Sequence, residues 1–446
     1  MRNDQPGGTM GDTDPVDPGP SRLKPPKELV AYDWVIAHTG TNWVKHIILE
    51  FPTREDTFLK LGLDGPGAYS IRMRVFFTGN RYAERIVTFT VTEKLLVGMG
   101  DSFASGEGNP DRWAELSDVG KLLASRKLTT LRQVIDRTVP TDREADWIEK
   151  EAHRSLSSAQ ALAASMLQSV YGETWKPAGG PRQAHFDFTP VTWVSFARSG
   201  AEIIEGLLLP QKGVTDYIGA GQVEECKRTL KYGQTIDALH ISIGGNDAGF
   251  AGTLADLTQG QSFWALVVGP AAPNLRAERL RALNQALGVG LPPGQEGTIG
   301  ASYNVLKAAV DDLNQTVPIS NVLVTGYPED IFFVRGPDGN LKFSACGIFE
   351  TQSGLLSIDQ QDGKIIQEAG QNLNSLIKRK CNEFGWTFVP TAPDFAGKGY
   401  CEGSMWIDAD ESCRIQADQR GTMHPSIEGH HAVAKRIHAA MLKEGV

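Results

Sequence analysis

From Leu95 to the C-terminus, short apolar runs alternate with stretches of helical periodicity, and this alternation constrains the fold more than any other feature. Five runs have the length and composition of buried strands: "KLLVG", "VTWVSF", "ALHISI", "NVLVTG" and "WTFVP". Helical spacing of apolar residues lies between them and is clearest over residues 155–169, 301–315 and 362–384. Strands that alternate with helices build a parallel sheet. The sequence therefore predicts an α/β domain over residues 95–446, a doubly wound parallel sheet with helical insertions.

A different pattern precedes this domain. Residues 1–27 are rich in Pro, Gly and Asp and have little to bury, so we interpret them as a disordered lead or linker. After them, β-type runs such as "NWVKHIILEF" and "RIVTFTVTEK" are separated by the turn signals "DGPG" and "TGN". We expect residues 28–94 to form a small β-sandwich. Its last two runs resemble the closing hairpin of the Ig-like modules found beside secreted enzymes, which would give it a carbohydrate-contacting, spacer or packing role.

Composition and charge exclude several classes of partner and cofactor. The net charge of −9 and the lack of a long basic run argue against nucleic acid and anionic membranes. No stretch approaches the roughly 18 apolar residues of a membrane span, and the N-terminus lacks the apolar core of a signal peptide. The five cysteines show no paired C-x-x-C spacing and no Cys/His cluster, so we expect no structural metal. Four of them lie from Cys346 onward, which is compatible with disulfides in a secreted protein or with free buried thiols.

Polar loops follow the first four apolar runs: "GMGDS", "ARSGAE", "GGNDAG" and "GYPED". Because the carboxyl ends of parallel strands share one edge of a sheet, these loops are predicted to converge on a crevice that binds ligands. The first loop does not match a dinucleotide-binding fingerprint, because Phe103 stands where its third glycine should be. It also departs from the G-x-S-x-G nucleophile elbow, since Ala104 occupies the position of the second glycine.

The blocks "GDSFASGEG", "ARSG", "GGND" and "MHP", in this order, resemble those of the SGNH, or GDSL-like, hydrolase family. The resemblance covers about residues 95–440 and implies a flavodoxin-like three-layer sandwich without a metal or organic cofactor. It matches Ser102 to the nucleophile and His424 to the base. Gly200 and Asn246 match the residues that form an oxyanion hole with the backbone N–H of Ser102. A serine hydroxyl needs a base to remove its proton, and the tetrahedral intermediate needs donors aimed at its oxygen, so these residue types fit acyl transfer.

Each of these residues also has a structural interpretation. Ser102 could N-cap the helix after the first strand. Asn246 and Asp247 could close the "GGND" turn through their side chains, and Gly200 could relieve a tight turn. Asp101 is expected to anchor the nucleophile loop through backbone hydrogen bonds. Because all four blocks occur together and in order, we interpret Ser102, Gly200 and Asn246 as site residues.

Among nine histidines, His424 has the position of a catalytic base. Apolar residues at three- and four-residue steps follow it, with Ser426 as the N-cap, and they predict a C-terminal helix that places His430 in the core. His424 lies in the loop before this helix, next to Pro425, where its ring can project into the crevice. His153 opens another helical pattern and is interpreted as structural.

The usual acid of the family is absent. Its last block normally reads D-x-x-H, and here Gly421 stands three residues before His424. One interpretation is a Ser/His dyad in which a backbone carbonyl, such as that of Gly421, accepts the second ring N–H. The others are that Asp418 reaches the ring, or that the hydrolase is inactive. A carbonyl fixes the tautomer as a carboxylate does but stabilises the imidazolium less, and we expect the dyad.

These features predict a two-domain serine carboxylic ester hydrolase that forms an acyl-enzyme. A small-molecule, lipid or polysaccharide acyl ester is the expected substrate, so phospholipase and carbohydrate deacetylase activity remain open. The apolar "FWALVVGPAA" could accommodate an acyl chain or form a core helix. The alternative function is an inactive hydrolase fold that serves as a secreted binding or scaffold protein. We expect a monomer that is secreted or at the cell surface, with a cytoplasmic location as the alternative.

Overall fold

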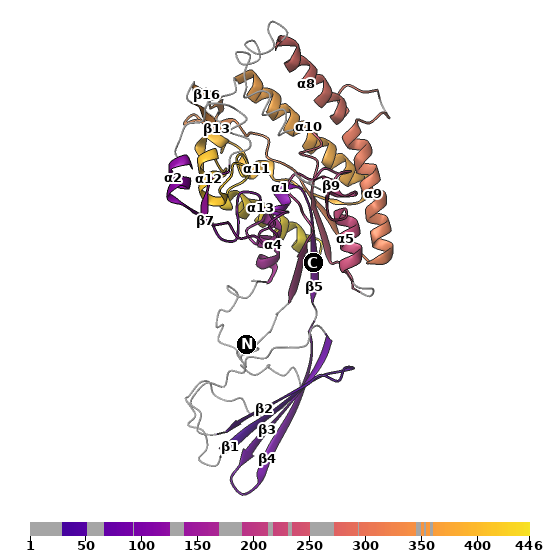
Figure 1. The fold of residues 1–446 in the computed structure, drawn as a ribbon. Helices are drawn as coiled ribbons and strands as arrows, with labels where there is room; N and C mark the ends of the chain where they lie inside the picture. The colour runs from indigo at the N-terminus through magenta and orange to yellow at the C-terminus, as the bar shows by residue number, and fades with distance from the viewer. Residues whose placement is uncertain are drawn as a thin grey trace. The chain divides into compact units, whose positions relative to one another are not determined.

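The computed structural model describes residues 29–50, 67–91, 93–124, 138–168, 190–212, 217–230, 234–249, 272–292, 294–344, 349–351, 354–356 and 360–446 (Figure 1). The chain divides into two compact units, and one boundary between them falls between Lys94 and Leu95. The predicted lead over residues 1–27 and most of the "FWALVVGPAA" segment lie outside the described residues.

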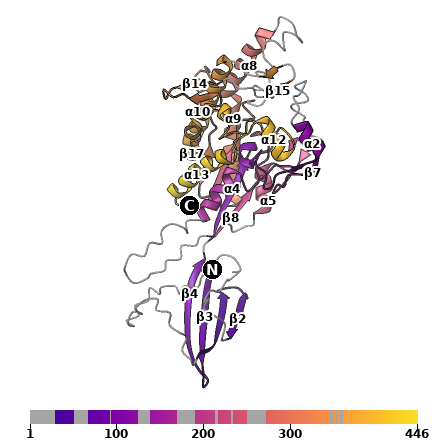
Figure 2. The ribbon, with the colours of Figure 1, turned by 90° about the vertical axis from the view of Figure 1, so that its left-hand side faces the viewer.

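The described part of the first unit is a four-stranded antiparallel sheet (Figures 1 and 2). Its strand order is β2 (Val44–Glu50), β1 (Leu29–His38), β3 (Gly67–Phe77) and β4 (Arg81–Val91). A three-residue turn with positive φ at Gly79 and Asn80 joins β3 to β4, as the "TGN" signal predicts. Ile36 and Tyr69 are fully buried on one face of this sheet. A second layer is not among the described residues, so the β-sandwich and its Ig-like character stay a prediction.

The second unit contains the predicted five-stranded sheet, and all five apolar runs become its strands. Its order is β17 (Thr387–Val389), β12 (Val322–Thr325), β11 (Ala238–Ser242), β5 (Lys94–Gly100) and β8 (Val191–Ser195). β11 pairs in parallel with both β5 and β12, and β12 pairs in parallel with β17. Numbered along the chain, the order is 2-1-3-4-5, the flavodoxin-like arrangement whose ligand crevice lies between the first and third strands. These are β5 and β11.

Helices cover both faces of this sheet, which gives the predicted three layers (Figures 1 and 2). Leu239 and Ile241 of β11 point to one face, and His240 and Ser242 point to the other. The first face packs on α5 (Gln222–Thr229), α8 (Ala272–Leu287), α9 (Thr298–Thr316) and α10 (Gln360–Phe384). The second packs on α4 (Ala159–Gln168) and α13 (Ile427–Lys443). The doubly wound fold is therefore confirmed, and α4, α9 and α10 correspond to the three helices expected from the sequence.

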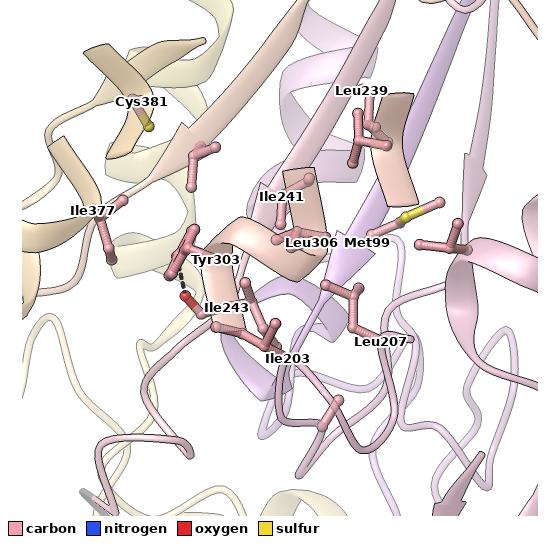
Figure 3. Close-up of a cluster of buried hydrophobic side chains, with 14 of the residues drawn as sticks. Met99, Ile203, Leu207, Leu239, Ile241, Ile243, Tyr303, Leu306, Ile377 and Cys381 are labelled. Atoms are coloured by element: carbon pink, nitrogen blue, oxygen red, sulfur yellow. Dashed lines mark hydrogen bonds between the residues drawn. The ribbon is translucent and has the colours of Figure 1, made fainter. Parts of the chain in front are cut away.

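The main hydrophobic core lies between the sheet and the α5–α9–α10 layer (Figure 3). Met99 of β5 and Leu239 and Ile241 of β11 meet Leu306 of α9 there. Tyr303 of α9 is fully buried, and its hydroxyl donates a 2.8 Å hydrogen bond to the carbonyl oxygen of Ile243, just after β11. This bond satisfies the one polar atom of a large core side chain, so the end of β11 is held against α9.

Shorter elements fill the connections. The helical ones are α1 (Ser102–Ser105), α2 (Asp118–Ala124), α11 (Ala392–Phe395), η2 (Tyr400–Glu402) and α12 (Ala409–Gln416). Antiparallel strand pairs are β6 (Glu115–Leu116) with β7 (Thr141–Arg143), β9 (Gln211–Lys212) with β10 (Tyr217–Ile218), β13 (Phe333–Arg335) with β14 (Leu341–Phe343), and β15 (Phe349–Thr351) with β16 (Gly354–Leu356). Among the described helices, none has the length and apolar character needed to cross a membrane.

Candidate active site

The predicted nucleophile lies where β5 turns into α1. Gly100 ends the strand with φ +137°, and a Cβ at this position would lie 2.0 Å from the carbonyl oxygen of Ser242, so only glycine lets β5 and β11 approach here. Asp101 is the N-cap of α1, and its carboxylate accepts a hydrogen bond from the backbone N–H of Phe103 at 3.0 Å. Asp101 therefore anchors the loop as expected. Because Asp101 caps the helix, Ser102 is not the N-cap, and its hydroxyl is free for another contact.

That contact is with His424. The Nε2 atom of His424 lies 2.8 Å from the Oγ atom of Ser102, although 322 residues separate the two in the chain. His424 belongs to the turn between α12 and α13, in which Met423 adopts a left-handed conformation with φ +63°. The turn is fixed by hydrogen bonds from the N–H of Met423 to the carbonyl of Ile407 and from the N–H of Ile407 to the carbonyl of His424. The two residues therefore have the geometry of a hydroxyl that donates to an imidazole acceptor.

The predicted oxyanion-hole residues lie on the loops after β8 and β11, and these loops are joined. The Asn246 Nδ2 atom donates to the carbonyl of Ala201 at 2.9 Å, and the Asp247 carboxylate accepts from the N–H of Ile203 at 3.1 Å. The side chains of Asn246 and Asp247 therefore both bind the loop that follows β8. Gly200 has φ +79°, so its conformation favours glycine. Within the described part of the chain, the backbone N–H groups of Ser102 and Gly200 have no acceptor.

Asp418, one of the two candidates named from the sequence for orienting the His424 ring, makes its hydrogen bonds to other groups. The Nδ1 atom of His424 lies 3.3 Å from the carbonyl oxygen of Thr422. The carbonyl of Gly421, the other candidate, accepts from the backbone N–H of His424 at 3.1 Å, and its hydrogen bonding, like that of Thr422 and Arg420, also raises the pKa of His424. Asp418 accepts hydrogen bonds from the side chain of Gln416 and the N–H of Arg420. A dyad with a carbonyl partner fits this geometry, and the carbonyl of Thr422 lies within hydrogen-bond distance of Nδ1, because the left-handed residue after it turns this group back toward the ring.

Comparison with known proteins finds similarity to two lipases. No family model matches the chain. A lipase of Streptomyces rimosus is 24% identical over 193 residues, which are 43% of this chain and 56% of that protein. Lipase 1 of Streptomyces coelicolor is 25% identical over 233 residues, 52% of this chain and 62% of that protein. The chain thus spans less than two thirds of the length of either relative.

These similarities fit the resemblance to the SGNH, or GDSL-like, hydrolase family. Two solved structures are similar to it at low identity. An extracellular lipase from Streptomyces rimosus is 17% identical with a TM-score of 0.44, and a phospholipase A1 from Streptomyces albidoflavus NA297 is 16% identical with a TM-score of 0.44. Each comparison covers 78% of this chain and 99% of the other.

Burial dominates the electrostatics of this candidate site. It lowers the pKa of His424 below the usual 6.5, partly opposed by the negative charge of Glu107 and by backbone hydrogen bonds. A lowered pKa keeps the ring neutral at pH 7, which is the form that can accept a proton. Burial also raises the pKa of Asp101 to about 7, although a 2.5 Å hydrogen bond from the hydroxyl of Tyr327 favours its charged form.

Glu107 is a site residue that the sequence analysis missed. It follows α1 directly, is fully buried, and accepts hydrogen bonds from the Nδ1 atom of His153 at 2.8 Å and the Nε2 atom of Gln416 at 2.8 Å. His153, interpreted as structural from the sequence, is thus the ion-pair partner of a buried carboxylate beside the site. A glutamate in the glycine-rich "SGEG" segment was the available signal, but its burial could not be read from the sequence.

A small internal cavity beside α1 is not the substrate crevice. Its walls include Phe103 and Ala104 of α1 and the rings of His240 and His430, and none of the four predicted site residues lines it. His430 faces the core, as its position in the C-terminal helix predicts. Burial lowers the pKa of both histidines to about 3, so the two rings are neutral and neither competes with His424 as the base.

Proposed function

We propose that this protein is a serine carboxylic ester hydrolase in which Ser102 forms an acyl-enzyme and His424 is the general base. The observation that carries this proposal is the 2.8 Å contact between the neutral imidazole of His424 and the hydroxyl of Ser102. A hydroxyl becomes an effective nucleophile when an adjacent base removes its proton. The similarity to two Streptomyces lipases supports an ester as the substrate.

The geometry defines the order of steps. The Oγ atom of Ser102 attacks the ester carbonyl carbon while its proton moves to the Nε2 atom of His424, and the carbonyl oxygen becomes an oxyanion. The free N–H groups of Ser102 and Gly200, with the second amide hydrogen of Asn246, are its proposed donors. Collapse of this intermediate expels the alcohol, which takes the proton from Nε2. Water, activated by the same ring, then releases the acid, while the Nδ1–H group donates to the carbonyl of Thr422 throughout.

The substrate class proposed is a carboxylic acyl ester of a lipid or a carbohydrate. The similar solved structures include a phospholipase A1 and, at 12% identity, a carbohydrate esterase with a carbohydrate-binding domain. The test therefore compares lipid esters with carbohydrate esters. Hydrolysis of p-nitrophenyl esters of increasing acyl length, of a phospholipid dispersion and of acetylated xylan would separate them. Release of acid from none of these by the intact chain would contradict the proposal and favour a binding protein.

We further propose that the protein acts outside the cytoplasm. Cys401 is disulfide-bonded, whereas Cys226 and Cys381 are free and buried. Disulfides persist in oxidising compartments, so one bridged cysteine favours secretion or the cell surface over a cytoplasmic location. One solved structure similar to this chain is of an extracellular lipase, in agreement with this proposal.

Substitution of the proposed amide donor should slow the chemical step. We expect Asn246→Ala to lower kcat by roughly 10²–10³ with little change in KM, because an oxyanion donor acts in the transition state. Steady-state kinetics on a soluble ester test this expectation, with Asn340→Ala, an exposed turn residue, as the matched control. A loss expressed in KM alone would contradict the assignment of Asn246.

The pH dependence follows from the direction of the His424 shift. Because burial lowers the pKa of His424 below 6.5, its neutral form persists to a lower pH than that of an exposed histidine. We expect the acid limb of kcat/KM to be centred below pH 6.5. Initial rates across this range, on an ester whose leaving group does not titrate there, measure it. An acid limb centred above pH 7 would show that His424 is not the base.

A further inference from the structure

The segment "GEGN", which follows α1, is fastened to the turn that carries His424. The Nε2 atom of Gln416 donates to the carboxylate of Glu107 at 2.8 Å. The Nδ2 atom of Asn109 donates to the carbonyl of Pro425, the residue after His424, at 2.8 Å. Both contacts are buried and bridge more than 300 residues of sequence. The polypeptide that carries the nucleophile therefore also holds the polypeptide that carries the base.

Two glycines bring these segments into direct backbone contact. A Cβ added to Gly421 would lie 2.7 Å from the Cα atom of Gly108, and one added to Gly108, which has φ +86°, would lie 2.4 Å from a methyl group of Ile407. Neither position has room for a side chain without a shift of the backbone or of Ile407. Because of this close approach, Glu107, the residue before Gly108, lies next to the turn that carries His424.

Glu107 is kept ionised in this buried position by its partners. Its side chain is fully buried, and an unpaired carboxylate there would be strongly destabilised. His153 supplies the opposite charge through the 2.8 Å contact of its Nδ1 atom, and the side chain of Ser199, next to Gly200, adds a hydrogen bond. Although burial acts against the charge, these partners lower the pKa of Glu107 to about 2. The carboxylate is therefore negative throughout the neutral pH range.

His153 has an unusual backbone conformation. Its φ is +49°, which is uncommon for a residue with a Cβ, and its ring stacks on Trp147 with centroids 4.5 Å apart and an interplanar angle of 7°. Backbone strain of this kind persists where the surrounding structure requires it, often at functional sites. Here it directs the ring of His153 at Glu107.

We infer that Glu107, paired with His153, is a positioning residue for the Ser102–His424 dyad: it fixes the His424 turn and supplies the negative charge that the family's aspartate otherwise provides. This inference rests on the proposed function. Glu107 does not touch the ring of His424; it acts through Gln416, through the Gly108–Gly421 contact, and through the field of its charge. The carbonyl of Thr422 sets the tautomer, and the buried carboxylate stabilises the imidazolium that forms when Ser102 loses its proton.

The charge of Glu107 should change the proton affinity of His424 in a direction that packing alone would not. Charged or titratable groups around the two residues are His153, Asp418, Arg420 and His430. In Glu107→Gln the negative charge disappears and the amide remains close in size. The protonated form of His424 is then less favourable, so its pKa should fall by about one pH unit. In His153→Gln the carboxylate loses its counter-charge but keeps its hydrogen bonds from Gln416 and Ser199, which hold it ionised, so the pKa of His424 should rise instead.

The test is a histidine NMR titration of the whole chain, with the His424 signal identified by its loss in His424→Gln. Wild type, Glu107→Gln, His153→Gln and the exposed control Glu144→Gln are compared, and the rate of labelling by a fluorophosphonate is measured on the same samples. We expect opposite pKa shifts in the first two variants and none in the control. Labelling of Glu107→Gln should slow by roughly tenfold to a hundredfold, less than the ~10⁴ associated with a triad aspartate.

An unchanged His424 pKa in a folded Glu107→Gln would overturn the inference and leave Glu107 with a purely structural role. If Glu107→Gln does not fold, His153→Gln decides alone, because a pKa of His424 that falls or stays constant would also overturn it. The NMR readout needs no turnover. A wild type that hydrolyses no ester and takes up no fluorophosphonate would therefore contradict the proposed function, and this result is distinct from a failure of the Glu107 assignment.

Discussion

Ser102→Ala is expected to remove ester hydrolysis almost completely, with kcat lower by about 10⁶, the loss found when the nucleophile of a serine hydrolase is deleted. The reason is that the hydroxyl is the attacking atom, and the 2.8 Å contact with His424 serves only to activate it. The side chain contributes little to packing, since Asp101 caps α1. The thermal midpoint should therefore stay close to that of the wild type.

Kinetics on one soluble ester and a thermal melt of the same preparation check this prediction. Ser404→Ala, which alters an exposed serine of the same unit, is the matched control and should keep full activity. Residual turnover in a folded Ser102→Ala within a factor of ten of the wild type would rule out Ser102 as the nucleophile.

His424→Ala should cost nearly as much as Ser102→Ala, whereas Asp418→Asn should lower kcat by less than about tenfold. His424 removes the proton from Ser102, and groups that act as a unit are each indispensable. Asp418 contacts Gln416 and the N–H of Arg420 and does not contact the ring. The carbonyl of Thr422 is the group next to Nδ1, and no substitution of a side chain removes it.

Both variants are to be measured on the same ester at the same pH, after confirmation that they are folded. A collapse of activity in Asp418→Asn that equals the effect of His424→Ala would replace the dyad with a triad in which Asp418 is displaced from its usual position. The expected loss from neutralising a true triad aspartate is about 10⁴, which is far from the limit of tenfold and easily distinguished.

The sheet and the pairing of Ser102 with His424 could be predicted from the sequence. Strands of a parallel sheet are buried on both faces and appear as continuous apolar runs, so all five were recognisable. The loops after such strands meet at one edge, which brings together blocks as distant as Ser102 and Asn246. His424 could be chosen over His430 because the helical spacing after Ser426 assigns His430 to the core, where it is 1% exposed.

The groups that surround His424 could not be predicted from the sequence, and the reason is physical. Which carbonyl lies under the ring depends on the backbone conformation of Met423, whose φ of +63° is not indicated by its residue type. The burial of Glu107 depends on segments that approach from residues 153 and 416, and the local "SGEG" sequence reads as an exposed loop. Close contacts between distant segments decide both features, and spacing along the chain carries no signal for them.

The measurement that tests the central claim most directly is the location of a covalent adduct. The intact chain is treated with a fluorophosphonate and digested, and the modified peptide is sequenced by mass spectrometry. The account predicts one adduct, on Ser102, and none in Ser102→Ala or His424→Ala under the same conditions. An adduct on a different serine, or labelling of Ser102→Ala at the rate of the wild type, would contradict it.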